Sequence, residues 1–493
     1  MKASLARLFA LACIAAVASA AAAQNSTALD NVRKLAHDSA KLEPELRHLT
    51  DVIGGRVPGT PAMQKAAEWA VASFRDAGAD SVRHEDFMLE TSWAEGETRV
   101  RIVAPTSFDV RARSIAWSPA LAKPLTARVV DIGRGAPAEF VNAGNLGGAI
   151  LLVHSDVLKK WDDLFAEYLE APAIIQRAQQ AGAAAIAWTA TRDYDILYRH
   201  INAQRDLFDA IPSVLLARED AERIARLAKE GGVQMSIDLP NKLGPPVRTW
   251  NVVAEIKGSD LANESVLIGA HLDSWELGTG ALDNGCNAVL TIEALRAIKA
   301  AGIKPRRTLR FVLFSGEEQG LLGSRAYVQA HHNQLDGLSA VIIFDTGTGQ
   351  VTGYSLGGRH DALDTINALV KPFADWGVTT QTEDAFWGTD NVDFLLEGVP
   401  TLVANQVEAN YLPNYHAYSD TYDKVDFPQL RRNVALAAYT VAYLGNADKK
   451  LAPRQTRKEI EKLLRETKLD EQLKTFGLWN EWQRNTEAGR AAH

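Results

Sequence analysis

Five residues that are far apart in the sequence carry side chains that can bind metal ions. They are His271, Asp283, Glu318, Asp345 and His416. Four of them follow an apolar segment that predicts a β-strand, and Asp283 follows His271 across a short loop. Open α/β sheets bind ligands beyond the carboxyl ends of their strands, so these side chains are expected to meet there. Imidazole nitrogen and carboxylate oxygen both suit zinc, and the set predicts a site for two zinc ions.

Two aspartates near His271 have roles that their spacing predicts. Two dications in one site need a carboxylate that can touch both, and Asp283 is the best candidate for this bridge. It lies in the segment 278–285 (Gly-Thr-Gly-Ala-Leu-Asp-Asn-Gly), whose glycines allow a close approach of the backbone. Asp273 is two residues beyond His271, on the same side of an extended segment. Its carboxylate is therefore expected to accept a hydrogen bond from the His271 imidazole.

Glu317 directly precedes Glu318, and the side chains of adjacent residues diverge. One carboxylate can therefore bind metal while the other faces a water molecule held by the metal. Such water loses its proton near neutral pH instead of at ~15.7. A neighbouring carboxylate can take that proton and pass it to a leaving amine. The pattern predicts a hydrolase with Glu317 as its general base.

Each of these residues, taken singly, has a more ordinary interpretation. A histidine after a strand more often makes structural hydrogen bonds, and a Glu-Glu pair in a loop is usually solvated. Short motifs are frequent by chance. Only the full set, in this order and at the ends of expected strands, favours the metal site.

The elements that would position these residues alternate between strand and helix. Strands are expected at 251–256, 266–270, 308–314, 340–344 and 401–404, and helices at 286–301 and 321–330. Short apolar strands separated by helices predict an α/β fold with a largely parallel sheet and helices on both faces. Before them, helices are expected at 28–48 and at 61–77, the second ending at Gly78.

The middle of the chain has a different sequence pattern. It predicts strands at 127–131, 149–153, 184–188 and 213–216, with helices at 173–181 and 219–229. This stretch has no cluster of histidine and acidic residues, and it is interpreted as an inserted α/β module that ends at the Gly-Pro-Pro linker 244–246. The tail from 451 is charged and helical, with Trp479 and Trp482 as its buried side chains.

Composition limits the protein class. The 493 residues are too many for one core, and 46% hydrophobic with 23% charged residues is ordinary for a globular protein. The net charge of −8 argues against a nucleic-acid partner. Residues 1–23 have the basic start, apolar stretch and small-residue end of a secretory signal peptide, and the stretch is too short for a membrane span. We therefore expect an exported protein, periplasmic or secreted, in which Cys286 is the lone cysteine and no internal disulfide forms.

Several motifs together resemble the co-catalytic zinc exopeptidases, a family that includes bacterial leucyl aminopeptidases and glutamate carboxypeptidases. They are His-Leu-Asp-Ser-Trp at 271–275, Ala-Leu-Asp-Asn-Gly at 281–285, Ser-Gly-Glu-Glu at 315–318, Phe-Asp at 344–345 and Tyr-His at 415–416. The resemblance extends through 56–60 and 251–256 and so covers nearly all of the mature chain.

The resemblance implies a division of labour among the site residues. One zinc would be bound by His271 and Asp345 and the other by Glu318 and His416, with Asp283 bridging the two. Glu317 would be the general base and Asp273 would orient His271. The resemblance also implies a cis peptide bond between Asp283 and Asn284, support of His416 by Asp420, and a homodimer.

It further implies a zinc-exopeptidase fold (phosphorylase/hydrolase-like) with an inserted protease-associated (PA) domain. The domains would be a signal peptide at 1–23, the first part of the peptidase domain at 24–110, the PA insertion at 111–245, the zinc peptidase domain at 246–450 and a helical tail at 451–493. One departure concerns the substrate side: Thr389-Asp390-Asn391 stands where many members have Ser-Asp-His.

The expected function is hydrolysis of dipeptides or short peptides by an exopeptidase. An aminopeptidase acting on longer peptides is one alternative, and glutaminyl cyclisation, which a PA insertion disfavours, is another. A silent receptor on the same fold is a third, although such relatives lose metal ligands and this chain keeps all five. The end of the peptide that is recognised stays open. Arg359 is a candidate anchor for a substrate carboxylate, but a solvated arginine is the commoner case.

Overall fold

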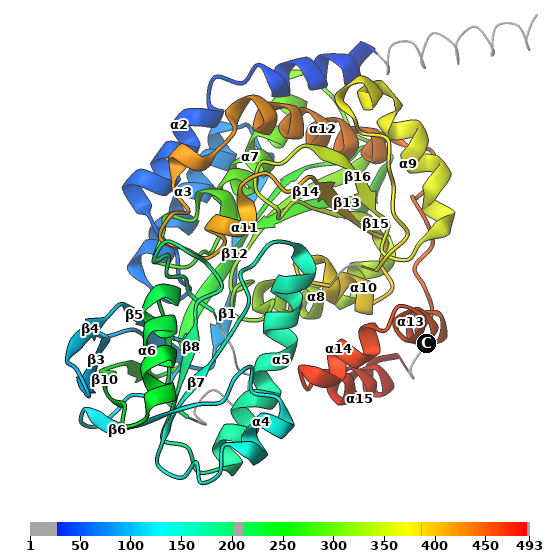
Figure 1. Cartoon of the computed structure of the whole chain (residues 1–493). Coiled ribbons are helices and arrows are strands. Elements are labelled where there is room, and N and C mark those ends of the chain that lie inside the picture. The colour runs from blue at the N-terminus through cyan, green and yellow to red at the C-terminus, as the bar shows by residue number, and fades with distance from the viewer. Residues whose placement is uncertain (1–26, 201–210, 386, 491–493) are drawn as a thin grey trace, which may run out of the picture.

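A seven-stranded central sheet forms the core of the computed structural model, which describes residues 27–200, 211–385 and 387–490 (Figure 1). In spatial order its strands are β1 (Ser81–Leu89), β12 (Val247–Ile256), β14 (Arg307–Phe314), β13 (Leu261–His271), β15 (Leu338–Ile343), β17 (Thr401–Gln406) and β16 (Val351–Ser355). The four strands β14, β13, β15 and β17 are parallel, and the pairings at both edges are antiparallel. The expected α/β fold with a mostly parallel sheet is confirmed.

Helices cover both faces of this sheet because alternate strand residues point to opposite sides. Val266 and Ile268 of β13 lie in the core shared with α3 (Pro61–Asp76), α7 (Cys286–Ala300) and α12 (Phe427–Asn446). Leu267 lies between them in the sequence and packs in the opposite core, with α8 (Leu322–Ala330) and α10 (Asn391–Leu396). Figure 1 shows these two groups of helices above and below the sheet. Both faces are thus closed to water, which explains the uninterrupted apolar runs of the central strands.

The N-terminal helices differ in part from expectation. The helix expected at 61–77 is confirmed as α3: the Thr60 side chain accepts the N–H of Met63, and Gly78 follows the helix with φ +91°. The single helix expected at 28–48 is wrong. Residues 27–37 are helical, and α2 (Leu42–Arg47) and a π-helical turn, η1 (His48–Ile53), follow after a break. The Ser39 hydroxyl binds Glu293 and accepts the N–H of Lys41, which diverts the backbone from a continuous helix.

A second, eight-stranded sheet forms the inserted module, which we define as residues 99–238. Its strands, in spatial order, are β4 (Phe108–Val110), β3 (Arg99–Ala104), β10 (Gln234–Asp238), β6 (Leu125–Asp131), β7 (Ile150–Val153), β8 (Ala185–Thr189), β9 (Ser213–Leu216) and β5 (Ala112–Ser114). The helices α4 (Pro137–Asn142) and α5 (Trp161–Gln180) lie on one face, and α6 (Arg218–Glu230) lies on the other.

The boundary expected at 111 differs from the sheet that the structure shows. β3 begins at Arg99 and pairs with β10, which is far away in the sequence. The alternating exposure of β3 fits either sheet equally well, so its partner could not be read from local pattern. A short two-stranded ribbon of β2 (Ser92–Ala94) and β11 (Lys242–Gly244) joins the inserted module to the central sheet.

The C-terminal segment forms three helices, α13 (Arg457–Glu466), α14 (Leu469–Thr475) and α15 (Trp479–Arg490). Trp479 and Trp482 are buried, and the indole N–H of Trp482 donates to the carbonyl of Leu396 at the end of α10. α14 also contacts α5 of the inserted module, as Figure 1 shows. None of the helices in the described part of the chain has the length and apolarity that crossing a membrane requires. The signal peptide expected at 1–23 lies outside the described residues.

Candidate active site

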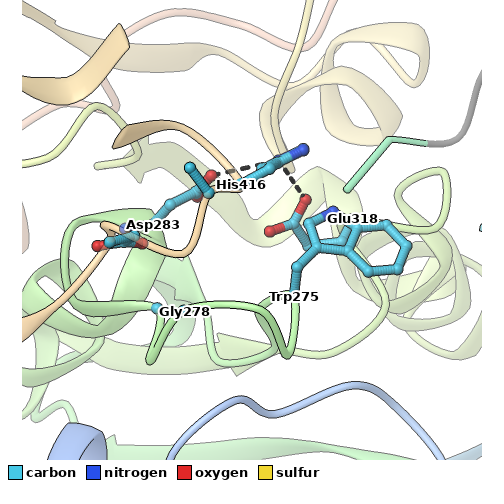
Figure 2. Close-up of a pocket in the computed structure, with 8 residues that line it drawn as sticks. Trp275, Gly278, Asp283, Glu318 and His416 are labelled. Carbon is cyan, nitrogen blue, oxygen red and sulfur yellow. Dashed lines mark hydrogen bonds and ion pairs between the residues drawn. The ribbon is translucent and has the colours of Figure 1, made fainter. Parts of the chain in front are cut away.

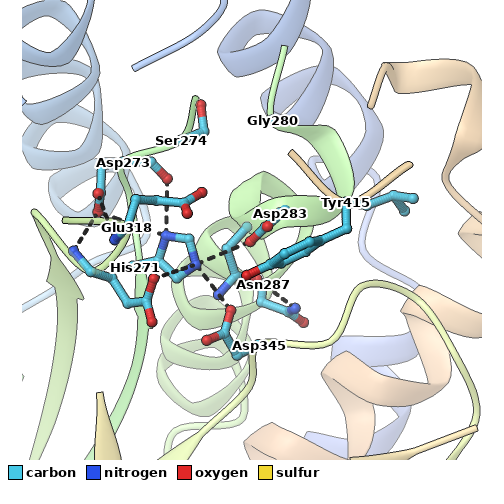
Figure 3. Close-up of polar contacts among 12 residues, drawn as sticks. His271, Asp273, Ser274, Gly280, Asp283, Asn287, Glu318, Asp345 and Tyr415 are labelled. Atoms are coloured by element: carbon cyan, nitrogen blue, oxygen red, sulfur yellow. Dashed lines mark hydrogen bonds and ion pairs between the residues drawn. The ribbon is translucent and has the colours of Figure 1, made fainter. Parts of the chain in front are cut away.

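The five expected metal ligands come together beyond the carboxyl ends of the central strands. His271 ends β13, Asp345 follows β15, and Glu318 follows β14. The other two lie on loops, Asp283 in the turn η3 (Ala281–Gly285) and His416 just after α11 (Tyr411–Asn414). β13 lies between β14 and β15 in the sheet, so three of the five ligands come from adjacent strand ends. Figures 2 and 3 show the side chains converging.

The ligands form two groups that share one residue. His271, Asp283 and Asp345 form the first group, and Asp283, Glu318 and His416 form the second. Nε2 of His271 lies 3.0 Å from Oδ1 of Asp345 and 3.2 Å from Oδ1 of Asp283. Nε2 of His416 lies 2.7 Å from Oε2 of Glu318 and 3.3 Å from Oδ2 of Asp283. The two oxygens of Asp283 therefore face different imidazoles, which is the arrangement of a bridging carboxylate.

Both imidazoles are oriented by main-chain carbonyl groups. Nδ1 of His271 donates to the carbonyl of Asp273 at 2.9 Å, and Nδ1 of His416 donates to the carbonyl of Arg199 at 2.8 Å. A neutral imidazole held in this way presents the lone pair of Nε2 to the carboxylates around it. A lone pair that faces carboxylate oxygens repels them unless a proton or a metal ion lies between, so the donor set fits metal ions.

The charge balance of the site also fits cations. Six carboxylates other than the general-base candidate are buried in or around it: Asp273, Asp283, Glu318, Asp345, Asp390 and Asp420. In the described part of the chain, Oδ2 of Asp283, Oε1 of Glu318 and Nε2 of His416 have no hydrogen-bond partner. Burial, followed by repulsion from Asp283, raises the pKa of Glu318 to about 7. Buried anions without partners are costly, and dications bound by these atoms would remove the cost.

Asp273 is close to His271 but has a different role from the one expected. Its Oδ1 is 3.7 Å from Nδ1 of His271, too far for a hydrogen bond, and the imidazole binds the Asp273 carbonyl instead. The carboxylate accepts the main-chain N–H groups of Glu317 and Glu318, each at 3.3 Å (Figure 3). Asp273 therefore fixes the backbone that carries Glu317 and Glu318. The expectation that its carboxylate orients His271 is corrected.

Asp420 was expected to support His416, but its carboxylate supports the backbone at Asp283. Its Oδ1 accepts the N–H groups of Ala281 and Leu282 at 3.0 and 2.7 Å, and its Oδ2 accepts that of Asp283 at 3.1 Å. One carboxylate thus binds three successive N–H groups at the start of η3. The peptide bond between Asp283 and Asn284 is cis, as the resemblance implied.

Arg56 is a buried residue of the site that the sequence analysis did not single out as a functional residue. Its guanidinium donates to the carbonyl groups of Gly54, Leu272, Thr279 and Gly280 at 2.6–3.0 Å. It ties the loop after His271 to the loop that carries Asp283. Neither a metal-ligand spacing nor a paired charge marks such an arginine in the sequence.

Glu317 lies beside the ligands without belonging to either group. Its Oε2 is 4.0 Å from Nε2 of His271, and 12% of its side chain is exposed. Burial, with added repulsion from Asp345 and Glu318, raises the pKa of Glu317 well above its ordinary value. This partly open position next to the first group is the one expected of a base that meets substrate.

The segment expected to line the substrate side is buried at the start of α10. Thr389, Asp390 and Asn391 are each at most 1% exposed, and burial raises the pKa of Asp390 well above its ordinary value. Arg359 is not an exposed anchor: it is 4% exposed, pairs with Asp361 and donates to the carbonyl of Pro453. None of its contacts among the described residues involves the five ligands, so nothing supports its role as a carboxylate anchor.

The inserted module contributes residues to the site that sequence reasoning missed. Nδ1 of His200 lies 3.1 Å from Nδ1 of His416, and the Tyr168 hydroxyl lies 2.9 Å from the same nitrogen of His200. Tyr168 also contacts the hydroxyl of Tyr415 at 3.1 Å. These residues come from a stretch that has no clustered acids and histidines, and only the packing of the two sheets brings them to the metal ligands.

A small cavity lies at the second group of ligands. It is lined by Trp275, Gly278, Gly280, Asp283, Glu318, His416, Ala417 and Asp420 (Figure 2). Glycines line it where a side chain would fill it: a Cβ atom on Gly278 would lie 2.5 Å from the carbonyl oxygen of Ala417. The backbone at Gly278 therefore lies close against the loop that contains Ala417 and Asp420.

Comparisons with known proteins agree with this geometry. A family model described as Peptidase family M28 matches residues 251–441, which include all five ligands. Carboxypeptidase Q of Rattus norvegicus is 29% identical over 417 residues, covering 82% of this chain and 85% of that protein. The crystal structure of a Peptidase M28 precursor from Shewanella amazonensis SB2B has a TM-score of 0.81 and 26% identity, and the match covers 88% of this chain and 99% of that one.

A zinc aminopeptidase from Bacillus subtilis shares the fold, with a TM-score of 0.66 and 20% identity over 86% of this chain and 98% of that one. The ligand geometry, the matched family segment and the similarity along most of the chain lead to one conclusion. Residues 251–441 match peptidase family M28, and the chain as a whole is similar in fold and sequence to a solved member of that family.

Proposed function

We propose that this protein is a zinc-dependent exopeptidase that hydrolyses dipeptides or short peptides. The observation that carries the proposal is the position of Asp283, whose two oxygens face the two histidine ligands. This arrangement fits a centre of two zinc ions. When bound, zinc would polarise the scissile carbonyl and lower the pKa of a bound water.

The protein's own residues divide the remaining work. His271 and Asp345 would hold one ion, Glu318 and His416 the other, and Asp283 both. Glu317 would take the proton of the attacking water and deliver it to the leaving amine, which needs a carboxylate near the ions but not bound to them. Its separation from both ligand groups supports this role.

The similarity to carboxypeptidase Q over most of the chain supports a substrate with a free carboxyl terminus. The similarity to a zinc aminopeptidase shows the fold alone, so release of N-terminal residues from longer peptides is the second candidate. Because all five ligands converge, we disfavour a catalytically silent receptor on this fold.

A panel of dipeptides tests the proposal. Zinc-loaded protein is assayed with free, N-blocked and C-blocked forms of the same dipeptide. We expect hydrolysis of the free form and loss of hydrolysis when the carboxyl terminus is blocked. Hydrolysis of the C-blocked form would identify an aminopeptidase, and no hydrolysis of any peptide by protein that contains two zinc ions would refute the proposal.

We also propose that the chain is exported from the cytoplasm and that the inserted module, residues 99–238, acts as a protease-associated insertion. The composition of residues 1–23 and the resemblance of the motifs support these two statements. N-terminal sequencing of protein from cell fractions tests the first. A mature chain that starts near Gln24 outside the cytoplasm is the expected result, and an intact cytoplasmic chain would contradict it.

A further inference from the structure

A segment of the inserted module pairs with the loop that carries His416. The N–H of Arg199 donates to the carbonyl of His416 at 3.0 Å, and Tyr198 forms an antiparallel bridge with Ala417. The N–H of Tyr418 donates to the carbonyl of Leu197 at 3.3 Å. Residues 197–199 therefore form one side of a short β-ribbon and the ligand loop forms the other.

This ribbon constrains both the backbone and the imidazole ring of His416. The backbone of His416 has φ +59°, a left-handed conformation that a residue with a Cβ atom rarely adopts unless its surroundings impose it. The carbonyl of Arg199 accepts the hydrogen bond from Nδ1 of His416, so it fixes the imidazole with Nε2 towards Asp283 and Glu318. Both the backbone and the ring of this ligand thus depend on Arg199.

The side chain of Arg199 explains why its carbonyl stays in place. The guanidinium is fully buried, and it donates to the carbonyl of Ser114 and to Oε2 of Glu95, the latter at 2.6 Å. It also binds the carboxylate of Glu276, which lies in the loop that follows His271. Arg199 therefore joins the inserted module, the junction around β2 and a loop of the metal site.

The geometry points to Arg199 as a positioning residue for His416, through which the inserted module completes the binding site of one of the two metal ions. This inference rests on the proposed function, because it needs an ion at Asp283, Glu318 and His416. The other ion would be held by His271, whose orienting carbonyl belongs to Asp273 of the central domain. Substitution of Arg199 should therefore lower the affinity for the ion at His416 and leave the affinity for the ion at His271 unchanged.

The test is a Co²⁺ titration of the full chain after removal of metal, with a competing chelator and with the absorption spectrum of each bound ion recorded. The main variant is Arg199→Met, which keeps most of the side-chain volume and removes the ion pairs. In the double variant R199M/E95Q, position 95 carries a neutral amide, so no buried carboxylate is left without its arginine. If the single variant does not fold, the affinities of the two Co²⁺ ions are compared in the double variant instead. The variant Arg199→Lys keeps the positive charge and tests whether the lost Co²⁺ affinity is partly restored.

Arg111→Met is the matched control. Arg111 also lies in the inserted module and also pairs with two carboxylates, Asp195 and Asp220, but its contacts do not involve the ligand loop. His416→Ala and His271→Ala provide the reference spectra for protein that has lost one ion or the other.

We expect wild-type protein and Arg111→Met to bind two Co²⁺ ions. Arg199→Met should bind one ion with unchanged affinity and the other at least about tenfold more weakly, and its spectrum should match that of His416→Ala. Two ions of unchanged affinity, equal weakening of both, or a spectrum matching His271→Ala would overturn the inference. A wild-type protein that binds fewer than two ions would instead refute the metal centre of the proposed function, so the two failures are distinguishable.

Discussion

The carboxylate of Asp420 accepts the main-chain N–H of Asp283 at 3.1 Å, and Asp283 in turn faces both histidine ligands. The same carboxylate accepts the two preceding N–H groups, of Ala281 and Leu282. The position of the shared ligand is therefore set by a residue that comes after the last ligand in the sequence. Burial raises the pKa of Asp420 to about 7, and the three N–H groups favour its charged form.

Asp420→Asn should lower the affinity for both metal ions, because Asp283 belongs to both groups. An amide has one acceptor oxygen and cannot accept all three N–H groups, so the η3 turn loses part of its support. We expect at least a tenfold loss of affinity for each ion, measured by zinc content after dialysis against graded chelator. Asp423→Asn changes a mostly exposed aspartate nearby and should leave both affinities unchanged. Loss of a single ion in Asp420→Asn would contradict this role.

Asp273→Asn should affect the base and Glu318 more than His271. The carbonyl that orients His271 is retained, whereas one of the two acceptors for the N–H groups of Glu317 and Glu318 is lost. We expect kcat to fall with little change in KM, and the ion at Glu318 to weaken before the ion at His271. The Co²⁺ spectra of the two ions report which one is released first. Earlier release of the ion at His271 would instead support the role expected from the sequence, in which the Asp273 carboxylate orients His271.

Glu317→Gln should keep both ions and lose catalysis. Its side chain belongs to neither ligand group, so zinc content should stay at the wild-type value. Removal of a general base typically lowers the rate about 10²–10⁴-fold, and the loss should appear in kcat. Peptide hydrolysis and zinc content are measured on the same sample. A variant with full zinc and full activity would show that another group transfers the proton.

Removal of metal should lower the thermal stability of the protein. Without cations the buried carboxylates repel one another, and a ligand that binds only the folded state at 1,000 times its Kd contributes about 4 kcal/mol. We expect a lower Tm in chelator and its recovery on addition of zinc, measured by calorimetry. In Asp345→Asn the chelator should change the Tm less than in wild type, because one ligand and one negative charge are absent. An unchanged wild-type Tm in chelator would argue against structural coupling of the metal.

Glu45, which pairs with Arg296 and not with the candidate metal ligands, should make stability depend on pH. Burial, followed by repulsion from Glu293, raises the pKa of Glu45 from 4.5 to about 7. The folded state therefore binds a proton that the unfolded state releases above pH 4.5, so stability should fall as the pH rises from about 4.5 to about 7. Glu45→Gln should flatten this dependence in urea unfolding, whereas Glu43→Gln, on the same helix and more exposed, should not. Equal slopes for Glu45→Gln and wild type would rule out the effect.

The convergence of four of the five candidate ligands was predictable because each of the four is marked by its local sequence. His271 and Asp345 follow buried strands, and Glu318 lies just beyond another, so an apolar run followed by a polar side chain was enough to find them. Asp283 was marked by its glycines. The central sheet was predictable for the same reason, since its parallel strands are apolar along their whole length.

The supporting contacts were not predictable in this way. Asp420 is 137 residues from Asp283, and Arg199 is 217 residues from His416. No local pattern distinguishes an aspartate that accepts three N–H groups from one on the surface. The role of Asp273 was misjudged because spacing gave the side of the strand correctly but not which of its oxygen atoms His271 would bind.

The ribbon between residues 197–199 and the His416 loop has a consequence for how the protein matures. Ligands from the central strands can assemble as soon as that sheet forms, but the last one is oriented only when two separately built sheets dock. An unfinished chain would therefore hold one ion and lack the second. Binding of an ion at the second position would then require that the two sheets have docked.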